Sequence, residues 1–385
     1  MLTRQDIPAL TAGFITVLVG YTSSAAIVFA AARAAGANAA ELASWLLALG
    51  LGMGLTCILL SLRYRVPVVT AWSTPGAALL MTSLSGVPLA QAIGAFVFSA
   101  ALMLLCGVTG LFERVMNRVP MPLAAALLAG ILVRFGLNVF KVLPQHLVLV
   151  LGMFAVYLLA RRRQSRYAIV LVLLTGLLIA GWQGELHWQG VGLELARPVW
   201  ISPAFSWPVL LGVGLPLFVV TMASQNIPGV ATLHANGYRP PISPILGGIG
   251  LVNLVLAPLG CFALNLAAIT AALCMTPQAH EDPQRRYLAS VAAGSIYLLL
   301  GVFGATVGAV FAAFPQALVL AVAGLALFGT LAAGLAIAMR DEPLREPALI
   351  TFLITASDMT LFGIGSAFWG LVGGVLAWLL LVRPK

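Results

Sequence analysis

Long apolar stretches alternate with short polar connections from one end of the chain to the other. A helix needs roughly 20 apolar residues to cross a bilayer core about 30 Å thick. By this measure the 385 residues divide into about 14 candidate membrane spans. The predicted spans are 9–32, 41–62, 66–84, 88–111, 120–140, 146–161, 167–183, 207–233, 243–257, 259–276, 286–313, 316–339, 346–358 and 360–382. An even number of spans places both termini on the same side of the membrane.

The composition supports a membrane location. The chain is 61% hydrophobic and only 8% charged, whereas an average soluble domain carries about 25% charged residues. A soluble globule of this size could not cover its surface, so we exclude an ordinary cytoplasmic enzyme, a nucleic-acid-binding protein, a disordered chain and a secreted disulfide scaffold. The apolar run 7–32 is too long for the h-region of a signal peptide, which has about 7–15 residues. We therefore predict a polytopic membrane protein surrounded by lipid, with no nucleic-acid partner.

The basic residues are distributed unevenly between the two sides of the predicted membrane. If both termini are cytoplasmic, the outer side keeps only Arg33, Lys141 and Arg197, and Arg134 lies within a span. Sixteen of the 20 basic residues then lie on the cytoplasmic side: Arg4, Arg63, Arg65, Arg114, Arg118, Arg161, Arg162, Arg163, Arg166, Arg239, Arg285, Arg286, Arg340, Arg345, Arg383 and Lys385. This is the segregation expected from the positive-inside rule. It explains the net charge of +9 without an anionic partner.

The two halves of the chain resemble each other. Residues 129–136 are similar to 323–329, and residues 69–80 are similar to 262–273. These matches pair the fifth span with the twelfth and the third with the tenth, although shared Ala/Leu/Gly composition could imitate them. Seven spans is an odd number, so the second copy would be inverted, as is typical of secondary transporters. The predicted repeats are 1–190 and 191–385.

The third segment carries the signals of a helix that begins in the middle of the membrane. Residues 66–72 are rich in β-branched and aromatic side chains, which indicates a short extended stretch. Ser73 and Thr74 precede Pro75, and a hydroxyl residue before a proline at the first helical position is an N-cap signature. We therefore predict a half-helix from Pro75 to about Ser83 in preference to a simple kink.

The tenth segment repeats this arrangement after Pro258 and Gly260, with Asn265 as the candidate N-cap. Non-helical backbone at membrane depth is tolerated only where it is buried in protein or lines a cavity. We therefore expect the two half-helix N-termini, Ser73–Gly76 and Asn265–Ala267, to face one cavity. Their free N–H groups and helix dipoles favour an anion there.

Polar clusters in two further spans complete the candidate site. Ser224, Gln225 and Asn226 lie in the eighth span, and residues 21–24 form a Tyr-Thr-Ser-Ser cluster in the first. Interhelical hydrogen bonds, or hydroxyl bonds to the preceding turn, are the alternative explanation. These four spans contain no Asp or Glu, which disfavours a cationic solute. An aromatic carboxylate suits this chemistry, and its predicted contacts are Tyr21, Ser23, Ser24, Trp72, Ser73, Thr74, Gly76, Gln225, Asn226, Phe262, Asn265 and Leu266.

The remaining charged and metal-binding residue types suggest no catalysis. We assign Arg134, the clear intramembrane charge, a structural or gating role, and we place Asp358 in the short link between the last two spans. The four cysteines and four histidines have no metal-ligand spacing. There is also no P-loop, dinucleotide fingerprint or nucleophile–base set. We expect no metal, no cofactor and no enzymatic activity.

Five stretches carry a resemblance to a known family: 20–27, 70–80, 127–136, 221–229 and 363–371. They resemble the BenE family of bacterial benzoate/proton symporters, and the resemblance covers essentially the whole chain. It implies import of benzoate, or of a similar aromatic carboxylate, across the inner membrane with protons.

The layout also resembles, more distantly, the uracil-permease-like fold. That resemblance implies seven-plus-seven inverted spans, with short strands before the half-helices of spans 3 and 10. It further implies a core domain (9–111 and 207–313) and a gate domain (112–183 and 316–382).

One departure from the fold family concerns the proton. Proton-coupled nucleobase transporters of this fold carry a glutamate in span 8 and another at the start of span 10. The matching positions here are Gln225-Asn226 and Leu264-Asn265. This argues against a nucleobase substrate and leaves the proton carrier open: the substrate itself, or less favourably Asp358 or a histidine. A passive anion channel and a nucleobase symporter stay as alternatives, and small-residue spacings permit a homodimer.

Overall fold

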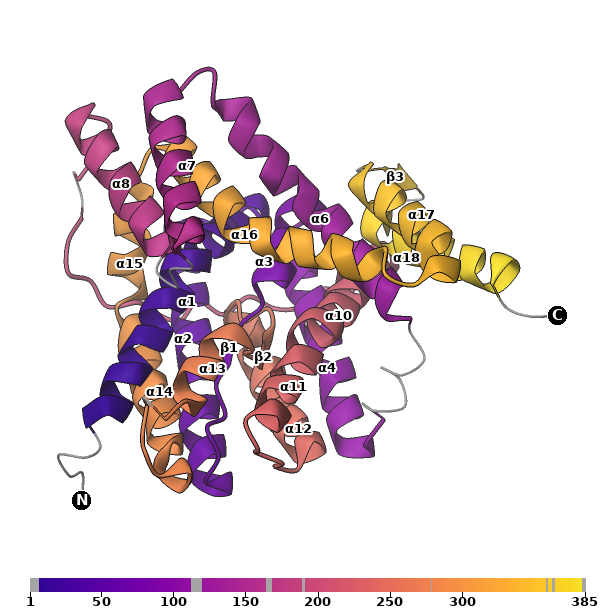
Figure 1. Ribbon diagram of the computed structural model, residues 1–385, viewed down its shortest axis with the longest axis horizontal. Coiled ribbons are helices and arrows are strands. Elements are labelled where there is room, and N and C mark those ends of the chain that lie inside the picture. Colours follow the sequence, from indigo (N-terminus) through magenta and orange to yellow (C-terminus); the bar gives the residue numbers. More distant parts are fainter. Residues whose placement is uncertain are drawn as a thin grey trace.

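A computed structural model describes residues 7–111, 120–163, 168–188, 191–277, 279–357, 359–361 and 364–382 (Figure 1). The first half of this part of the chain contains α1 (Ile7–Ala34), α2 (Ala39–Tyr64), β1 (Thr70–Trp72), α3 (Thr74–Ser83), α4 (Leu89–Thr109), α6 (Met121–Val142), α7 (Leu147–Arg162) and α8 (Ala168–Trp182). The second half contains α9 (Trp207–Val209), α10 (Leu215–Thr221), α11 (Ile227–Ala235), α12 (Ile242–Leu256), β2 (Leu264–Leu266), α13 (Ile269–Met275), α14 (Tyr287–Val302), α15 (Gly304–Ala312), α16 (Gln316–Ala338), α17 (Arg345–Ala356), β3 (Thr360–Leu361), β4 (Ile364–Gly365) and α18 (Ser366–Leu381). The protein is therefore predominantly helical.

Several helices have the length and apolarity that a membrane span requires. Within the described ranges six helices meet both criteria, and two bent pairs bring the number to eight. The predicted continuous span 286–313 is one of these pairs, because α14 and α15 meet at an angle of 70°. Gly301 and Gly304 flank this bend, and both lie so close to α2 that neither has room for a Cβ. The glycines thus allow α14 and α15 to pack separately on α2.

The helices form two sets that pack mainly within themselves. In the first set, α2 packs on α14, α4 on α12 and α1 on α14. In the second set, α6 packs on α16 and α17, α17 on α18, and α7 on α8. Figure 1 shows α6, α7, α8, α16, α17 and α18 across the upper part of the view, with most of the first set below them.

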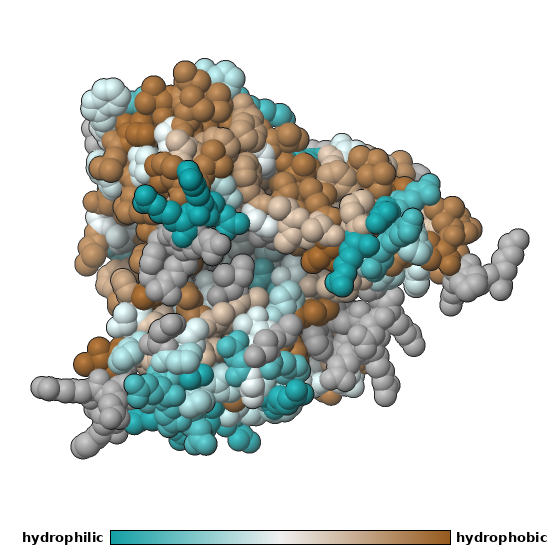
Figure 2. Space-filling model, in the orientation of Figure 1, coloured by the Kyte–Doolittle hydropathy of each residue, from teal (hydrophilic) through white to brown (hydrophobic). Residues whose placement is uncertain are grey.

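The two sets differ in the side chains that they expose in this view. Hydrophobic residues cover much of the upper part, whereas hydrophilic residues gather along the lower edge (Figure 2). Large apolar side chains such as Leu178, Trp182 and Leu380 are among the most exposed. Exposed apolar side chains in such numbers are compatible with lipid as the surrounding solvent.

A short antiparallel sheet lies at the centre of the first set (Figure 1). Strand β1 pairs with β2 in the register Thr70↔Leu266, Ala71↔Asn265 and Trp72↔Leu264. The ladder continues beyond the strands, because the Ser73 amide donates to the Ala263 carbonyl (2.8 Å). The sheet thus joins the segment before α3 to the segment before α13.

The two strands lead into helices that begin differently. Helix α3 starts at Thr74, and the Ser73 hydroxyl accepts a hydrogen bond from the Gly76 amide at 2.9 Å, as the N-cap signature predicts. Helix α13 starts only at Ile269 and has no side-chain cap. The prediction that Asn265 caps this helix is therefore wrong. Asn265 lies within β2, where its backbone pairs with Ala71, so it cannot also precede the first helical turn.

Candidate functional site

The outer edge of β2 is closed by side-chain amides. The Leu264 amide donates to Asn253 Oδ1 (2.8 Å), and Asn253 Nδ2 donates to the Leu264 carbonyl (2.9 Å). Two residues further along β2, the Leu266 amide donates to Asn226 Oδ1 (3.0 Å). A strand edge in an apolar interior must find partners for its backbone groups. Asn253 on α12 and Asn226 beside α11 supply them.

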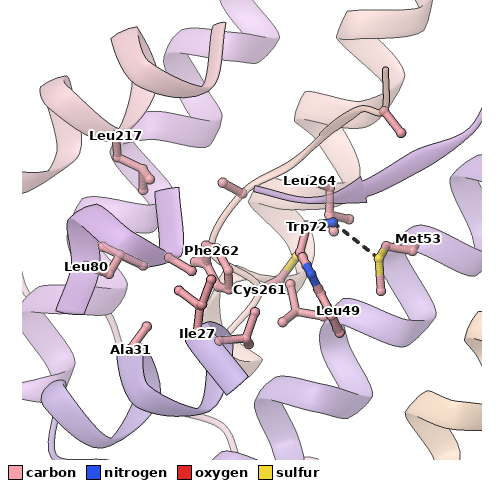
Figure 3. Packing of buried hydrophobic residues seen from close by; sticks show 14 of the residues in the cluster. Ile27, Ala31, Leu49, Met53, Trp72, Leu80, Leu217, Cys261, Phe262 and Leu264 are labelled. Atoms are coloured by element: carbon pink, nitrogen blue, oxygen red, sulfur yellow. Dashed lines mark hydrogen bonds between the residues drawn. The ribbon is translucent and has the colours of Figure 1, made fainter. Parts of the chain in front are cut away.

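Sulfur atoms from α2 close the outer edge of β1. The Thr70 amide donates to Cys57 Sγ (3.1 Å), and the Trp72 amide donates to Met53 Sδ (3.3 Å; Figure 3). Thiols and thioethers are weak acceptors compared with a carboxamide oxygen. The outward amides of β1 therefore meet weaker acceptors than those of β2, while the Thr70 hydroxyl adds hydrogen bonds with Thr56 and with the Met53 carbonyl of α2.

On the β1 side, two residues of α1 contact Trp72. The indole Nε1 donates to the Ser24 hydroxyl (2.7 Å), which in turn donates to the Gly20 carbonyl one turn earlier (2.7 Å). The Tyr21 ring lies against the indole, with the two centroids 4.6 Å apart. Tyr21 is buried, and its hydroxyl has no hydrogen-bond partner among the described residues. Helix α1 bends by 45° between Tyr21 and Ser24, where this hydroxyl-to-carbonyl bond competes with the helix ladder.

The polar cluster of the predicted eighth span forms a π-helical turn. The turn, η3 (Met222–Asn226), ends with the Ile227 amide bonded to the Met222 carbonyl five residues earlier. Pro228 follows and has no N–H to donate to the carbonyl of Ser224, which favours the wider turn. The same order occurs earlier in the helix, where the π-helical turn η2 (Leu210–Gly214) also ends two residues before a proline.

The two amides of this turn have different surroundings. Asn226 is fully buried, and its Nδ2 donates to Asn265 Oδ1 (2.7 Å). Asn265 Nδ2 bonds the Ala263 carbonyl at 3.2 Å. Gln225 is half-buried, and its carboxamide forms no hydrogen bond with any residue that the structure describes. Of the two amides, Asn226 is thus the one that holds the turn on β2.

The structure brings most of the predicted site residues to the strand pair. Tyr21, Ser24 and Trp72 lie on the β1 side. Asn226, Asn265 and Leu266 meet on the β2 side, and Ser73, Thr74 and Gly76 form the start of α3. The side chain of Ser23 lies outside what the structure describes.

Phe262 has a different environment from Tyr21 and Trp72, the other two predicted aromatic contacts. Its ring lies 6.1 Å from Trp45 and 6.2 Å from Phe96, measured between centroids, and it is fully buried (Figure 3). Phe262 is thus a member of an aromatic packing cluster. Gly260 follows the 3₁₀-helical turn Ala257–Leu259 and has φ +99°. A Cβ at this position would collide with the Trp45 ring.

Arg134 contacts the end of a helix. Its guanidinium donates to the carbonyl of Ala356, the last residue of α17, at 3.1 Å. A cation at a helix C-terminus interacts favourably with the helix dipole, in keeping with the structural role expected for this residue. Asp358 lies outside the described residues.

Two cavities lie near the strand pair and its following helix. The first, beside Asn265 and Asn253, holds about 10 Å³, which is roughly the space of one water. The second holds about 270 Å³ and is lined by Thr11 and Ala12 of α1 and by Leu273 and Thr276 at the end of α13. Within the described ranges, no three His, Cys, Asp or Glu residues form a group that could hold a metal ion.

Asn253 was not among the residues predicted for the site. The sequence signal is an isolated amide in the apolar segment 243–257. Such an amide requires a partner, but the sequence does not reveal that the partner is a strand edge.

The fold matches solved structures of membrane proteins. It aligns with the transmembrane domain of a cyanobacterium bicarbonate transporter, BicA, with a TM-score of 0.60 at 15% identity, covering 98% of each chain. It aligns with SLC26A9 with a TM-score of 0.65 at 17% identity, covering 98% of this chain and 65% of that one. The expected likeness to this transporter fold is thereby confirmed, and the protein is a predominantly helical polytopic membrane protein.

Comparison of the sequence identifies the class and then the family. The chain is 48% identical to "Inner membrane protein YdcO" of Escherichia coli (strain K12), covering 97% of this chain and 96% of that protein. It is 40% identical to the "Benzoate membrane transport protein" of Acinetobacter baylyi (strain ATCC 33305 / BD413 / ADP1), covering 99% and 98%. Fold and sequence together define a membrane transport protein, not an enzyme. Residues 3–380 match the family described as benzoate membrane transport protein, and the chain belongs to this BenE family.

Proposed function

We propose that this protein is a secondary active transporter that imports benzoate, or a similar small aromatic carboxylate, together with protons across the bacterial inner membrane. The observation that carries the proposal is family membership over residues 3–380. The name of the Acinetobacter baylyi relative supports benzoate as the substrate, and that of the Escherichia coli relative supports the inner membrane as the location. The absence of Asp and Glu from the described residues of the strand pair and its flanking helices, α1 and α10–α11, supports an anionic substrate.

The proposed topology has fourteen spans in two inverted repeats, 1–190 and 191–385, with spans 3 and 10 broken and both termini cytoplasmic. Contacts between segment ends support it. The connection after α8 bonds through Ala196, Ile201 and Ala204 to the carbonyls of Val302, Pro258 and Ala90. The topology places Pro258 and Ala90 at outer ends of their segments and Val302 in the outer half of the span 286–313. At the opposite side, Arg286 donates to the carbonyl of Met275, and both residues lie at predicted cytoplasmic ends.

Alternating access would arise from movement between the two sets of helices. We assign α1–α4 and α9–α15 to the core domain (9–111 and 207–313), and α6–α8 and α16–α18 to the gate domain (112–183 and 316–382). Apolar residues of α6 and α16, such as Ile131 and Leu327, join the same hydrophobic cluster as the core helices. An apolar interface of packed helices can slide with small shifts, which supports a rocking core.

The proposed binding site uses the start of α3 and the turn η3. The Thr74 N–H at the start of α3, with the helix dipole, would hold the carboxylate, and Gly76, whose amide already donates to the Ser73 hydroxyl, would complete the capped first turn beside it. Gln225 would donate a further hydrogen bond. The rings of Tyr21 and Trp72 would pack against the aromatic part of the substrate.

The other predicted contacts would hold the binding site in shape without touching the substrate. Asn226, Asn265 and Leu266 would keep η3 on the strand pair, and Ser73 would cap α3. Ser24 would orient the indole of Trp72, Ser23 lies on the same helix, and Phe262 would support the turn before β2.

Proton coupling does not require a carboxylate in the site. A weak acid can carry its own proton as a neutral molecule or as an anion–proton pair, so the substrate itself is the proposed proton carrier. The cavity beside Asn265 holds roughly one water, so it does not admit an aromatic acid in this conformation.

Uptake of radiolabelled benzoate into proteoliposomes tests the proposal, with and without an inward proton gradient. We expect accumulation above equilibrium only with the gradient, resistant to unlabelled uracil and sulfate. Equilibration without the gradient would instead identify a passive channel. Competition by uracil would favour a nucleobase symporter, and no uptake at all would remove the proposed substrate.

The site assignment is tested by Gln225→Ala and Asn265→Ala. We expect Gln225→Ala to abolish uptake because it removes the available carboxamide, and Asn265→Ala to do so because it removes the partner of Asn226. The matched control is Gln183→Ala, at an exposed glutamine after α8. Full uptake by both site variants, with normal amounts in the membrane, would refute the assignment.

A further inference from the structure

We infer that Asn253 is a positioning residue for transport: its carboxamide takes the place of a third strand beside β2 and fixes the register of the sheet at the binding site. The inference rests on the proposed function. Asn253 belongs to α12, outside the segments that carry the proposed substrate contacts.

The contacts of Asn253 are those of a neighbouring strand. Its Oδ1 accepts from the Leu264 amide at 2.8 Å and its Nδ2 donates to the Leu264 carbonyl at 2.9 Å, so one side chain satisfies both outward backbone groups of one residue. Cys261 Sγ also lies 3.5 Å from its Oδ1. Asn253 is only 2% exposed, so both bonds are buried.

The position of Leu264 in the ladder means that the two hydrogen bonds from Asn253 also fix the pairing of its neighbours. Leu264 is paired with Trp72, and its neighbour Asn265 is paired with Ala71. A slip of one residue turns every side chain of a strand to the opposite face. It would turn Asn265 away from Asn226 and shift the pairing of Trp72. Asn253 opposes this slip because its two bonds fit only one residue of β2.

The helix that carries Asn253 is itself fixed. Gly250, one turn earlier on α12, packs so closely on α4 that a Cβ would lie 2.6 Å from the Leu104 backbone nitrogen. Gly107 of α4 is equally close to Gly247 of α12. Asn253 therefore holds β2 from a rigid support, whereas sulfur atoms, which are weaker acceptors, hold β1 from α2.

Two substitutions separate this role from simple packing. Asn253→Leu keeps the approximate volume but leaves both groups of Leu264 without partners. Asn253→Asp has a neutral form with one O–H donor and one carbonyl acceptor, which can make both bonds, and an ionised form without the donor. Asn138→Leu is the matched control, because Asn138 is a half-buried amide on α6, in the gate domain.

The experiment is benzoate exchange in proteoliposomes with the same pH on both sides, at acidic and at neutral pH. We expect Asn253→Leu to lower the maximal exchange rate by about tenfold or more, and Asn138→Leu to have little effect. The rate of Asn253→Asp relative to wild type should rise as the pH falls. Wild-type exchange by Asn253→Leu, or a rate for Asn253→Asp that stays as low as that of Asn253→Leu at acidic pH, would overturn the inference.

Hydrogen–deuterium exchange provides a readout that does not depend on the substrate. We expect the Leu264 amide to be protected in the wild type and in Asn138→Leu, and to exchange faster in Asn253→Leu. If the wild type does not exchange benzoate, the proposed function fails, and this measurement still decides the inference: unchanged protection of Leu264 in Asn253→Leu would overturn it.

Discussion

Single residues at the strand pair show how an apolar interior accommodates a piece of sheet. The outward amides of Leu264 and Leu266 each reach an asparagine, and that of Trp72 reaches a methionine sulfur. Buried backbone groups without partners are costly, so these side chains are as necessary to the sheet as the pairing itself. The site residues Trp72 and Asn265 are held in place by this arrangement.

The hydrogen bond from Trp72 Nε1 to the Ser24 hydroxyl gives a prediction at this scale. Ser24→Ala leaves a buried N–H without an acceptor, which costs about 1–3 kcal/mol of unfolding free energy. In a Trp72→Phe background the N–H is absent, so Ser24→Ala should cost less by about 1–2 kcal/mol. Thermal unfolding of the four proteins in detergent measures this coupling.

The control for this cycle replaces Ser24→Ala with Ser295→Ala. The Ser295 hydroxyl bonds only to its own helix, at the Val291 carbonyl, so its effect should be the same with Trp72 and with Phe at position 72. Additive effects of Ser24→Ala and Trp72→Phe would contradict the proposed orientation of the indole.

Residue roles could be predicted from the sequence where the deciding partner is close along the chain. Ser73 acts as an N-cap because its partner is the amide three residues later, a short-range relation that Pro75 reinforces. The role of Asn265 depends on Ala71, far away in the sequence, and pairing with it overrides the capping preference. The hydrogen bonds of Asn253 depend on the same sheet, which explains why its contact with Leu264 could not be predicted.

At the scale of elements, prolines set the shape of the helix that carries Gln225. The turns η2 and η3 each end two residues before a proline, at Pro216 and Pro228. The missing N–H removes one bond of the α-helical ladder and makes a five-residue spacing acceptable. The sequence predicted an irregularity at Pro228 but not its form, because the π-helical turn also depends on the bond from Asn226 to β2.

Restoring the missing N–H should lower transport. Pro228→Ala allows a bond to the Ser224 carbonyl, which favours an ordinary α-helix and removes the extra residue of the turn. One residue corresponds to about 100° of helix rotation, so Asn226 would leave the Leu266 amide. We expect uptake to fall by about tenfold or more, and thermal stability in detergent to fall as well, because the buried Leu266 amide loses its partner.

Pro216→Ala is the comparison for this change. It acts on η2, whose main neighbours outside its own helix are α4 and α18, so its effect on uptake should be smaller. Wild-type uptake by Pro228→Ala would show that the π-helical turn does not position Gln225.

At the scale of the whole molecule, pattern and charge in the sequence predicted the fold class and most of its segments. Each of the fourteen predicted segments contains a helix in the structure. The bend between α14 and α15 escaped prediction because it depends on how Gly301 and Gly304 meet α2. Apolar composition measures the fit of a segment to lipid, whereas bends and breaks arise from contacts between segments.

The two faces of the molecule should differ in the reagents that reach them, which tests the proposed topology. The cavity beside Thr11, between the start of α1 and the end of α13, would open toward the cytoplasm, and Leu193, 84% exposed after α8, would lie outside. The four native cysteines are buried, so they should contribute little background to labelling. In right-side-out vesicles an impermeant maleimide should modify Leu193→Cys but not Thr11→Cys, and in inverted vesicles the reverse. This result requires an odd number of spans between the two positions. Labelling of both positions from the same side would therefore contradict the inverted repeats, and this conclusion does not depend on the substrate.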